Sequence, residues 1–197
     1  LLGRQNNLMG WLDRAWVAAC ACLIVAVAAV ICIECWYPKD KYELMMQDWL
    51  VREGHWQDVI DRAEKYQVRT TFSSNAVNLA LAMTGQLADR QFEFYQDGPS
   101  ALIMPSVRDN FSNLPSAEAF YHLGMINSAK RYMYDIQESI LNGRKSGRCM
   151  KRIAECFIIN GQYKVAKKYL DVLKQTLFYR SWAEETEQCL YDEVKIN

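Results

Sequence analysis

Hydrophobic and polar residues divide this chain into two unequal regions. From Ala15 to Ile33, 19 successive residues carry no charge, whereas beyond Pro38 apolar residues recur every three or four positions. A charge-free run of that length is apolar on all sides of a helix and spans roughly 30 Å, the thickness of a bilayer's hydrocarbon core. Apolar residues at helical spacing predict amphipathic helices, and the strict alternation typical of strands is rare. The pattern therefore predicts an all-α chain.

The first region is expected to form one transmembrane helix over residues 15–37, preceded by a membrane-proximal segment, residues 1–14. Aromatic rings favour the headgroup level of a bilayer, and Trp16 and Trp36 stand near the two ends of the apolar run. A cleaved signal peptide is the alternative, but its apolar region is shorter, about 7–15 residues. Because the chain begins with Leu1 instead of methionine, we expect it to be a piece of a longer protein.

Basic residues flanking the apolar run do not decide its orientation. Arg4 and Arg14 precede it, and Lys39, Lys41 and Arg52 follow it. Orientation in a membrane follows the excess of lysine and arginine on the cytoplasmic side, and here the two sides are nearly equal.

The region from residue 38 to residue 197 contains four stretches that align on a glycine. In each stretch a large apolar residue stands four positions before the glycine and another apolar residue two positions after it. A glycine tolerates the left-handed conformation that ends many helices, so each stretch predicts a helix, a turn and an antiparallel helix. The glycines are Gly54, Gly85, Gly124 and Gly161; four positions before them stand Leu50, Leu81, Phe120 and Phe157, and two after them Trp56, Leu87, Ile126 and Tyr163.

A small residue five positions after the glycine marks where the two helices of a hairpin approach each other. Ala129 and Ala166 fill this position in the last two stretches, Val59 fills it in the first, and Arg90 stands there in the second. An arginine is too large for a close approach of two backbones. The second stretch therefore departs from the pattern.

These positions resemble the tetratricopeptide repeat. In the last stretch Gly161, Tyr163, Ala166 and Leu170 match the turn and second helix of that family, and Ala154 falls where its first helix carries a small residue. The resemblance covers roughly residues 42–176. It implies a solenoid of stacked helical hairpins whose first helices line a concave groove, a surface that in such proteins binds peptides and partner helices.

Two features depart from the repeat family. The glycines are separated by 31, 39 and 37 residues instead of 34, and Gln47 and Asn78 occupy the small position of the first helix in the first two stretches. The widest interval contains residues 96–116, rich in proline, asparagine and serine, which predict a long connection. Its apolar stretch, residues 101–104, is expected to pack against the repeats. A closing helix is predicted over residues 181–193, with capping-box spacing at Ser181.

Composition adds little chemistry. From Pro38 onward the chain has 21 basic and 21 acidic residues, and this balance argues against a nucleic-acid partner, which would favour a basic surface. Cys32 and Cys35 have C-x-x-C spacing but no second pair of ligands, and no phosphate-binding glycine motif occurs. We therefore expect no metal, no cofactor and no catalytic residue in this chain. Only a disulfide between Cys189 and Cys149 or Cys156 stays open, because the latter two lie too far apart on one helix.

The resemblance to tetratricopeptide repeats places candidate binding residues on the concave face. In the third hairpin the candidates lie on the first helix and comprise an acidic, an aromatic and a histidine side chain. The corresponding positions of the fourth hairpin add basic charge. A solvated helix face is the simpler alternative. The candidates are Glu118, Tyr121, His122, Arg148, Lys151 and Glu155.

The sequence thus favours a membrane-tethered helical-repeat module that binds or scaffolds a protein or peptide partner. The layout also resembles the C-terminal part of multi-pass bacterial membrane proteins of uncharacterised function, which implies a bacterial inner membrane and a repeat domain on the extracytoplasmic side. On that resemblance, the alternative is an accessory domain of a larger membrane enzyme or transporter whose active site lies upstream. Binding of a lipid or glycan in the groove is a third possibility.

Overall fold

The computed structural model describes residues 3–67, 69–106 and 111–190, and every regular element within these ranges is a helix. The all-α prediction is confirmed. The chain divides into two compact units, the first ending at Tyr42 and the second beginning at Glu43. Each is described by itself.

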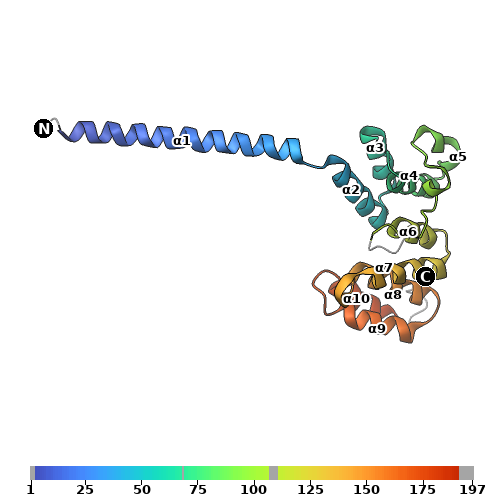
Figure 1. Ribbon diagram of the computed structural model, residues 1–197. Coiled ribbons are helices and arrows are strands. Elements are labelled where there is room, and N and C mark those ends of the chain that lie inside the picture. The colour runs from blue at the N-terminus through green and yellow to red at the C-terminus, as the bar shows by residue number, and fades with distance from the viewer. Residues whose placement is uncertain (1–2, 68, 107–110, 191–197) are drawn as a thin grey trace. The chain divides into compact units, whose positions relative to one another are not determined.

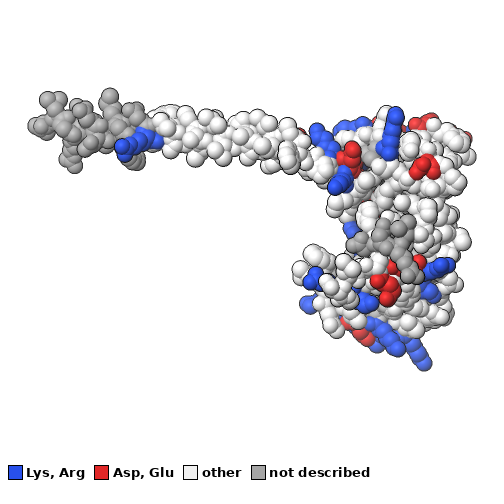
Figure 2. All heavy atoms as spheres, in the orientation of Figure 1, with Lys and Arg blue, Asp and Glu red and all other residues white. Residues whose placement is uncertain are grey.

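The first unit consists mainly of α1, a single helix from Gly3 to Trp36. Its segment Arg14–Trp36, 23 residues, is long and apolar enough to cross a membrane, and none of it is buried. Figure 2 shows few charged side chains on the visible face of this segment. Membrane spans and signal sequences share this length and composition. The helix ends one residue before the predicted boundary at Tyr37, and Pro38 separates it from the next helix.

The second unit is a succession of helical hairpins followed by a closing helix (Figure 1). Helices that are neighbours in the chain pack against each other, since α3 contacts α4, α7 contacts α6 and α8, and α9 contacts α8 and α10. The helices are α2 (Lys39–Glu53, which begins in the first unit), α3 (Trp56–Tyr66), α4 (Thr71–Met83), α5 (Leu87–Arg90), α6 (Leu114–His122), α7 (Ile126–Ser139), α8 (Gly147–Ile159), α9 (Tyr163–Leu173) and α10 (Arg180–Cys189).

All four predicted turns are present and share one hydrogen-bond pattern. At Gly161 the backbone N–H donates to the carbonyl of Ile158 at 2.9 Å, and the N–H of Gln162 donates to the carbonyl of Phe157 at 2.8 Å. The corresponding two bonds close the other three turns. Each glycine has a φ between 69° and 75°, in the left-handed region, so the glycines are required by the turn itself.

Three of the four residues predicted at the small position of a second helix are buried, and α7 packs on α6 and α9 on α8 as expected. Val59, Ala129 and Ala166 are completely buried. The apolar interior forms two main clusters, one built from α2, α3 and α4 and the other from α6, α7, α8, α9 and α10. A third, smaller group around Phe120 and Cys156 lies between α6, α7 and α8.

The second hairpin is incomplete. Its second helix, α5, ends at Arg90 after one turn, a short 3-10 helix (Gln91–Glu93) follows, and Phe94 is extended. The position that should be small holds Arg90, whose guanidinium turns outward to Glu64 and Glu93. A close approach of α5 to α4 along a full helix is therefore blocked, and the chain leaves the hairpin early.

The long connection packs against α4 through its backbone. A second 3-10 helix, Gly98–Ala101, contacts α4, and Ala101 is fully buried. The amides of Asn78 and Asn75 donate to the carbonyls of Ala101 and Leu102 at 3.0 and 2.5 Å. Asn78, at a position that the repeat family fills with a small residue, thus binds the connection. Residues 107–110 lie outside the described part, and α6 begins at Leu114, before the predicted end of the connection.

The closing helix α10 covers the last apolar face. Ala183 and Leu190 are buried, and Trp182 packs against the same cluster. The predicted capping box at Ser181 is wrong: the helix starts at Arg180, and the Ser181 hydroxyl donates to Glu185 at 2.9 Å. Residues 191–193 of the predicted helix lie outside the described residues.

Candidate functional site

The six candidate binding residues lie together on α6 and α8. Glu118 is central to the group, although its side chain is only 2% exposed. Its carboxylate accepts from Arg152 at 2.6 Å and pairs with Arg148 at 3.4 Å. A carboxylate this deeply buried needs such partners, because an unpaired charge in the interior is costly. Glu118 therefore holds α6 and α8 together instead of facing an open groove.

Arg148 connects these residues to α2 of the first hairpin. Its two terminal nitrogens donate to both carboxylate oxygens of Asp48 on α2, at 2.5 and 2.9 Å. Burial by itself lowers the pKa of the Arg148 guanidinium, but the bonds to Asp48 and the charge of Glu118 raise it above its usual range. The pair joins α2 to α8, whose residues Leu50 and Met150 belong to different apolar clusters.

Sequence reasoning missed Asp48 and Arg152. A signal for Asp48 was present, since it stands six positions before Gly54, as Glu118 and Glu155 stand six positions before their own glycines. Arg152 carried no comparable signal, because no other stretch has a basic residue at its position.

Arg152 is held by two carboxylates and one ring. It donates to Glu118 and to Glu155, each at 2.6 Å, and its guanidinium lies 3.9 Å from the centroid of the Tyr121 ring. Burial raises the pKa of Glu155, while Arg152 and Lys151 act in the opposite direction. Burial also raises the pKa of the Tyr121 hydroxyl. The guanidinium is thus fixed by charge and by the face of an aromatic ring.

The remaining candidates extend this group on both sides. His122 contacts Tyr121 and the edge of Trp56, with ring centroids 5.5 and 4.9 Å apart. Burial lowers the pKa of the His122 imidazole, although Glu118 opposes the shift. On the other side Lys151 lies 4.9 Å from the centroid of the Trp182 ring. We call these six half-buried side chains the aromatic–cationic stripe: Trp56, Tyr121, His122, Lys151, Arg152 and Trp182.

Little space remains beneath this group. The cavity bordered by Asp48, Val51, Phe72 and Glu118 has a volume of about 10 Å³, barely room for one water molecule. The charges of Asp48, Glu118 and Arg148 therefore fill the inner face of the unit, and any ligand there would have to lie on the stripe instead of entering between the helices.

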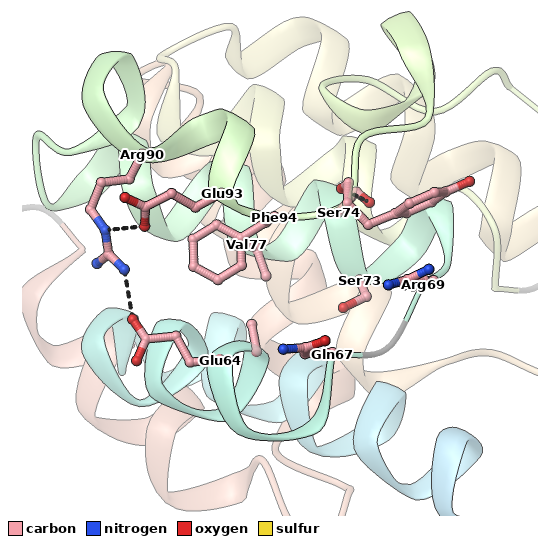
Figure 3. A pocket seen from close by; sticks show the side chains of 11 residues that line it. Glu64, Gln67, Arg69, Ser73, Ser74, Val77, Arg90, Glu93 and Phe94 are labelled. Atoms are coloured by element: carbon pink, nitrogen blue, oxygen red, sulfur yellow. Dashed lines mark hydrogen bonds and ion pairs between the residues drawn. The ribbon is translucent and has the colours of Figure 1, made fainter.

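A larger cavity, of about 520 Å³, lies between α3, α4 and the segment after α5 (Figure 3). No sequence pattern pointed to it. It exists because the second hairpin ends early, so that Phe94 and Tyr95 border a space that a full helix would have filled. Its polar lining includes Gln67, Arg69 and Ser73.

Candidate metal ligands do not gather in the part of the chain that the structure describes, where no three His, Cys, Asp or Glu side chains form a group that could hold an ion. Cys149, Cys156 and Cys189 are free thiols, and burial raises the pKa of Cys156 to about 11. A thiol with so high a pKa is a poor nucleophile at neutral pH.

Comparison with known proteins places the chain in a family. Residues 5–197 match a family model described as "Family of unknown function (DUF6057)". No curated protein and no solved structure matches the chain. Because the match includes α1 and the whole succession of hairpins, the chain belongs to the DUF6057 family.

Proposed function

We propose that the hairpin unit is a binding module for a protein or peptide partner and that α1 tethers it to a membrane. The observation that carries the proposal is the aromatic–cationic stripe, which runs over α3, α6, α8 and α10. The residue types of the stripe are those enriched at the centres of protein interfaces, where tryptophan, tyrosine and arginine supply most of the binding energy.

The stripe is ordered before any partner arrives. Arg152 is fixed between Glu118, Glu155 and the Tyr121 ring, and Lys151 lies over Trp182. Side chains that are already held lose little rotamer freedom on binding, so more of the contact energy remains as affinity. Of the two charged side chains, Lys151 keeps 34% of its surface exposed and Arg152 keeps 11%, so Lys151 offers a partner the larger charged surface.

Stacked hairpins support the same role. The tetratricopeptide-like reading of the four hairpins assigns α6 and α8 to the concave side, and the stripe lies mostly on these two helices. Such solenoids present extended surfaces to peptides and helices. The proposed partner is therefore an extended peptide or a single helix, with an acidic side chain that complements Lys151.

The proposed location is a bacterial inner membrane, with α1 as the span and the hairpin unit on the extracytoplasmic side. Support comes from the length and composition of the segment Arg14–Trp36. Protease treatment of intact cells and of inverted membrane vesicles tests the sidedness. Digestion of the hairpin unit only in inverted vesicles would place it in the cytoplasm and refute this part of the proposal.

Site-specific photo-crosslinking tests the binding role. A photoreactive amino acid replaces Lys151 on the stripe or, as the control, Lys164, an exposed lysine on α9, in the full chain in its native membrane. We expect one discrete polypeptide adduct from position 151 and none from position 164, and we expect the adduct to be lost when Trp182→Ala is added. Equal labelling at both positions, or no polypeptide adduct at position 151, would refute a partner on the stripe.

The same experiment addresses the alternative role as an accessory domain of a larger membrane enzyme or transporter. In that case the adduct from position 151 would be internal, joining the hairpin unit to membrane segments of the same polypeptide. Mass spectrometry of the crosslinked peptides distinguishes an internal adduct from a second protein.

A further inference from the structure

The 520 Å³ cavity beside α4 has the size of a small-molecule site and lies apart from the stripe. Its volume is within the range of ordinary ligand pockets, roughly 300–1,000 Å³. Figure 3 shows its polar side chains gathered at two ends, with Phe94 and Val77 between them. The two ends differ in charge, and this difference decides what the cavity can accept.

One end presents polar groups that the protein leaves unused. Arg69, Gln67 and the Ser73 hydroxyl lie near one another there, and their side chains make no hydrogen bond or ion pair with any residue that the structure describes (Figure 3). Ser73 is only 2% exposed. Ser73 also lines the cavity, so its hydroxyl is available to a bound ligand. Gln67 and Arg69 are exposed to solvent, and the positive charge of Arg69 favours an anionic ligand.

Ser73 can be compared with its neighbour. The Ser74 hydroxyl, on the same helical turn, donates to the carbonyl of Tyr95 at 2.7 Å and has no capacity left for donation. The Ser73 backbone N–H is also used, since the Thr70 hydroxyl accepts it at 3.2 Å. The side chains that line the cavity and make no hydrogen bond with a described residue therefore include the Ser73 and Tyr95 hydroxyls, Gln67 and Arg69.

The middle of the cavity is apolar. The Phe94 ring and the side chains of Val77 and Ala63 line it, and the latter two belong to the apolar cluster of the first two hairpins. An apolar or aromatic group bound here would leave water for a surface of carbon atoms, which is favourable by about 25 cal/mol for each Å² buried.

The far end already has its own ion pairs. Arg90 donates to Glu64 at 2.6 Å and to Glu93 at 2.8 Å, so two carboxylates surround one guanidinium. The excess negative charge at this end repels a second anionic group. A ligand with one charge fits the cavity better than a ligand with two.

We propose that this cavity binds an apolar monocarboxylate, with the carboxylate on Arg69 and the Ser73 hydroxyl and the apolar group against Phe94. Arginine matches a carboxylate with two parallel hydrogen bonds, and the Ser73 hydroxyl donates a third. The same chemistry is found in a free carboxylic acid and in the C-terminal residue of a peptide. A peptide C-terminus has a peptide group next to its carboxylate, which the Gln67 amide could bind, and a simple carboxylic acid lacks this group.

Three probes test this proposal on the full chain in lipid nanodiscs, with binding measured by ligand-observed NMR. N-acetyl-phenylalanine carries the carboxylate, the ring and a peptide group; N-acetyl-phenylalaninamide lacks the charge; 3-phenylpropionate lacks the peptide group. We expect the first and third probes to bind and the amide to bind roughly tenfold or more weakly, because it loses charge-assisted hydrogen bonds. Tighter binding of the first probe than of the third identifies a peptide C-terminus as the source, and the reverse order a free acid.

Two substitutions and a control complete the experiment. Arg69→Gln should weaken both acids roughly tenfold while leaving the affinity for the amide unchanged, and Ser73→Ala should weaken them several-fold. Arg131→Gln is the control, because Arg131 is an exposed arginine on α7 that borders neither the cavity nor the stripe. Binding of the amide as tight as that of the acids, an unchanged affinity in Arg69→Gln, or no binding of any probe would overturn the proposal.

This inference does not depend on the proposed partner. Every residue that lines the cavity lies outside the stripe. Loss of the crosslink at position 151 with retained acid binding would refute the partner alone, and the opposite result would refute the carboxylate site alone.

Discussion

The bond between Arg148 and Asp48 predicts that one exchanged side chain weakens the connection between the two halves of the hairpin unit. In Arg148→Met the aliphatic stem remains and the charge is lost. Asp48 then keeps a carboxylate that is 15% exposed without its partner at 2.5 and 2.9 Å. Glu118 loses its longer contact but keeps Arg152 at 2.6 Å. The main penalty therefore falls on Asp48.

The expected loss lies between two reference values. Removing one partner of a fully buried ion pair costs about 3–5 kcal/mol, and an exposed pair contributes about 0–1 kcal/mol. Since Arg148 and Asp48 retain 16% and 15% exposure, some water reaches both, and we expect a loss of about 2–4 kcal/mol in the free energy of unfolding. The double variant with Asp48→Asn should recover part of it, giving a coupling energy of about 1–2 kcal/mol.

Urea unfolding of the full chain in nanodiscs measures the loss in free energy and the coupling energy, with the fluorescence of single tryptophans as the signal. Trp56 packs on the cluster of α2, α3 and α4, and Trp182 on that of α6 to α10. We expect coincident transitions in the parent chain and separated ones in Arg148→Met. Arg52→Met is the control, since Arg52 pairs with Glu53 at the surface and should cost about 1 kcal/mol or less. A coupling energy near zero, or equal losses in Arg52→Met and Arg148→Met, would refute the reasoning.

Three further outcomes follow from single positions. An added Cβ at Gly161 meets no atom within 4 Å, so Gly161→Ala should lower the free energy of unfolding by about 1–2 kcal/mol through the φ of 69° alone, and Gly161→Asn should lower it less. Equal melting temperatures for the parent chain and both variants would contradict this. At Gly147 the added Cβ would lie 2.7 Å from the Tyr179 ring, so Gly147→Ala should lower the melting temperature, and Tyr179→Leu should restore part of the loss. Burial holds the pKa of His122 in the folded chain below 6.5, so the unfolded chain binds more protons as the pH falls below 6.5, and the free energy of unfolding should decrease. In His122→Gln this decrease, measured by urea unfolding at several pH values, should be smaller. An identical pH profile in both proteins would contradict the role of His122.

Most of the fold could be predicted from local patterns in the sequence. The four turns could be predicted because both hydrogen bonds of each turn come from residues within five positions of each other. The long apolar helix could be predicted for a similar reason, since its length and lack of charge are properties of one continuous segment. Arg90 even marked the hairpin that departs from the pattern.

The candidate site was predicted only in part. The resemblance to tetratricopeptide repeats assigned Glu118 and Arg148 to one face, but it does not say whether that face is open. The answer depends on Asp48, which lies 100 positions before Arg148 in the chain and reaches it only because the hairpins stack. Asp48, Arg148 and Glu118 therefore pair with one another between the helices instead of lining an open groove.

The helices, their turns and the long apolar segment follow from the sequence alone, because each depends on interactions between residues that are close along the chain. Which charges pair with each other, and where space remains, depends on how the helices pack. The seam of Asp48, Arg148 and Glu118 joins three helices, and the cavity beside Phe94 exists because a helix ends early. Pairing and empty space depend on distances between elements that are remote in the sequence, and no local pattern contains them.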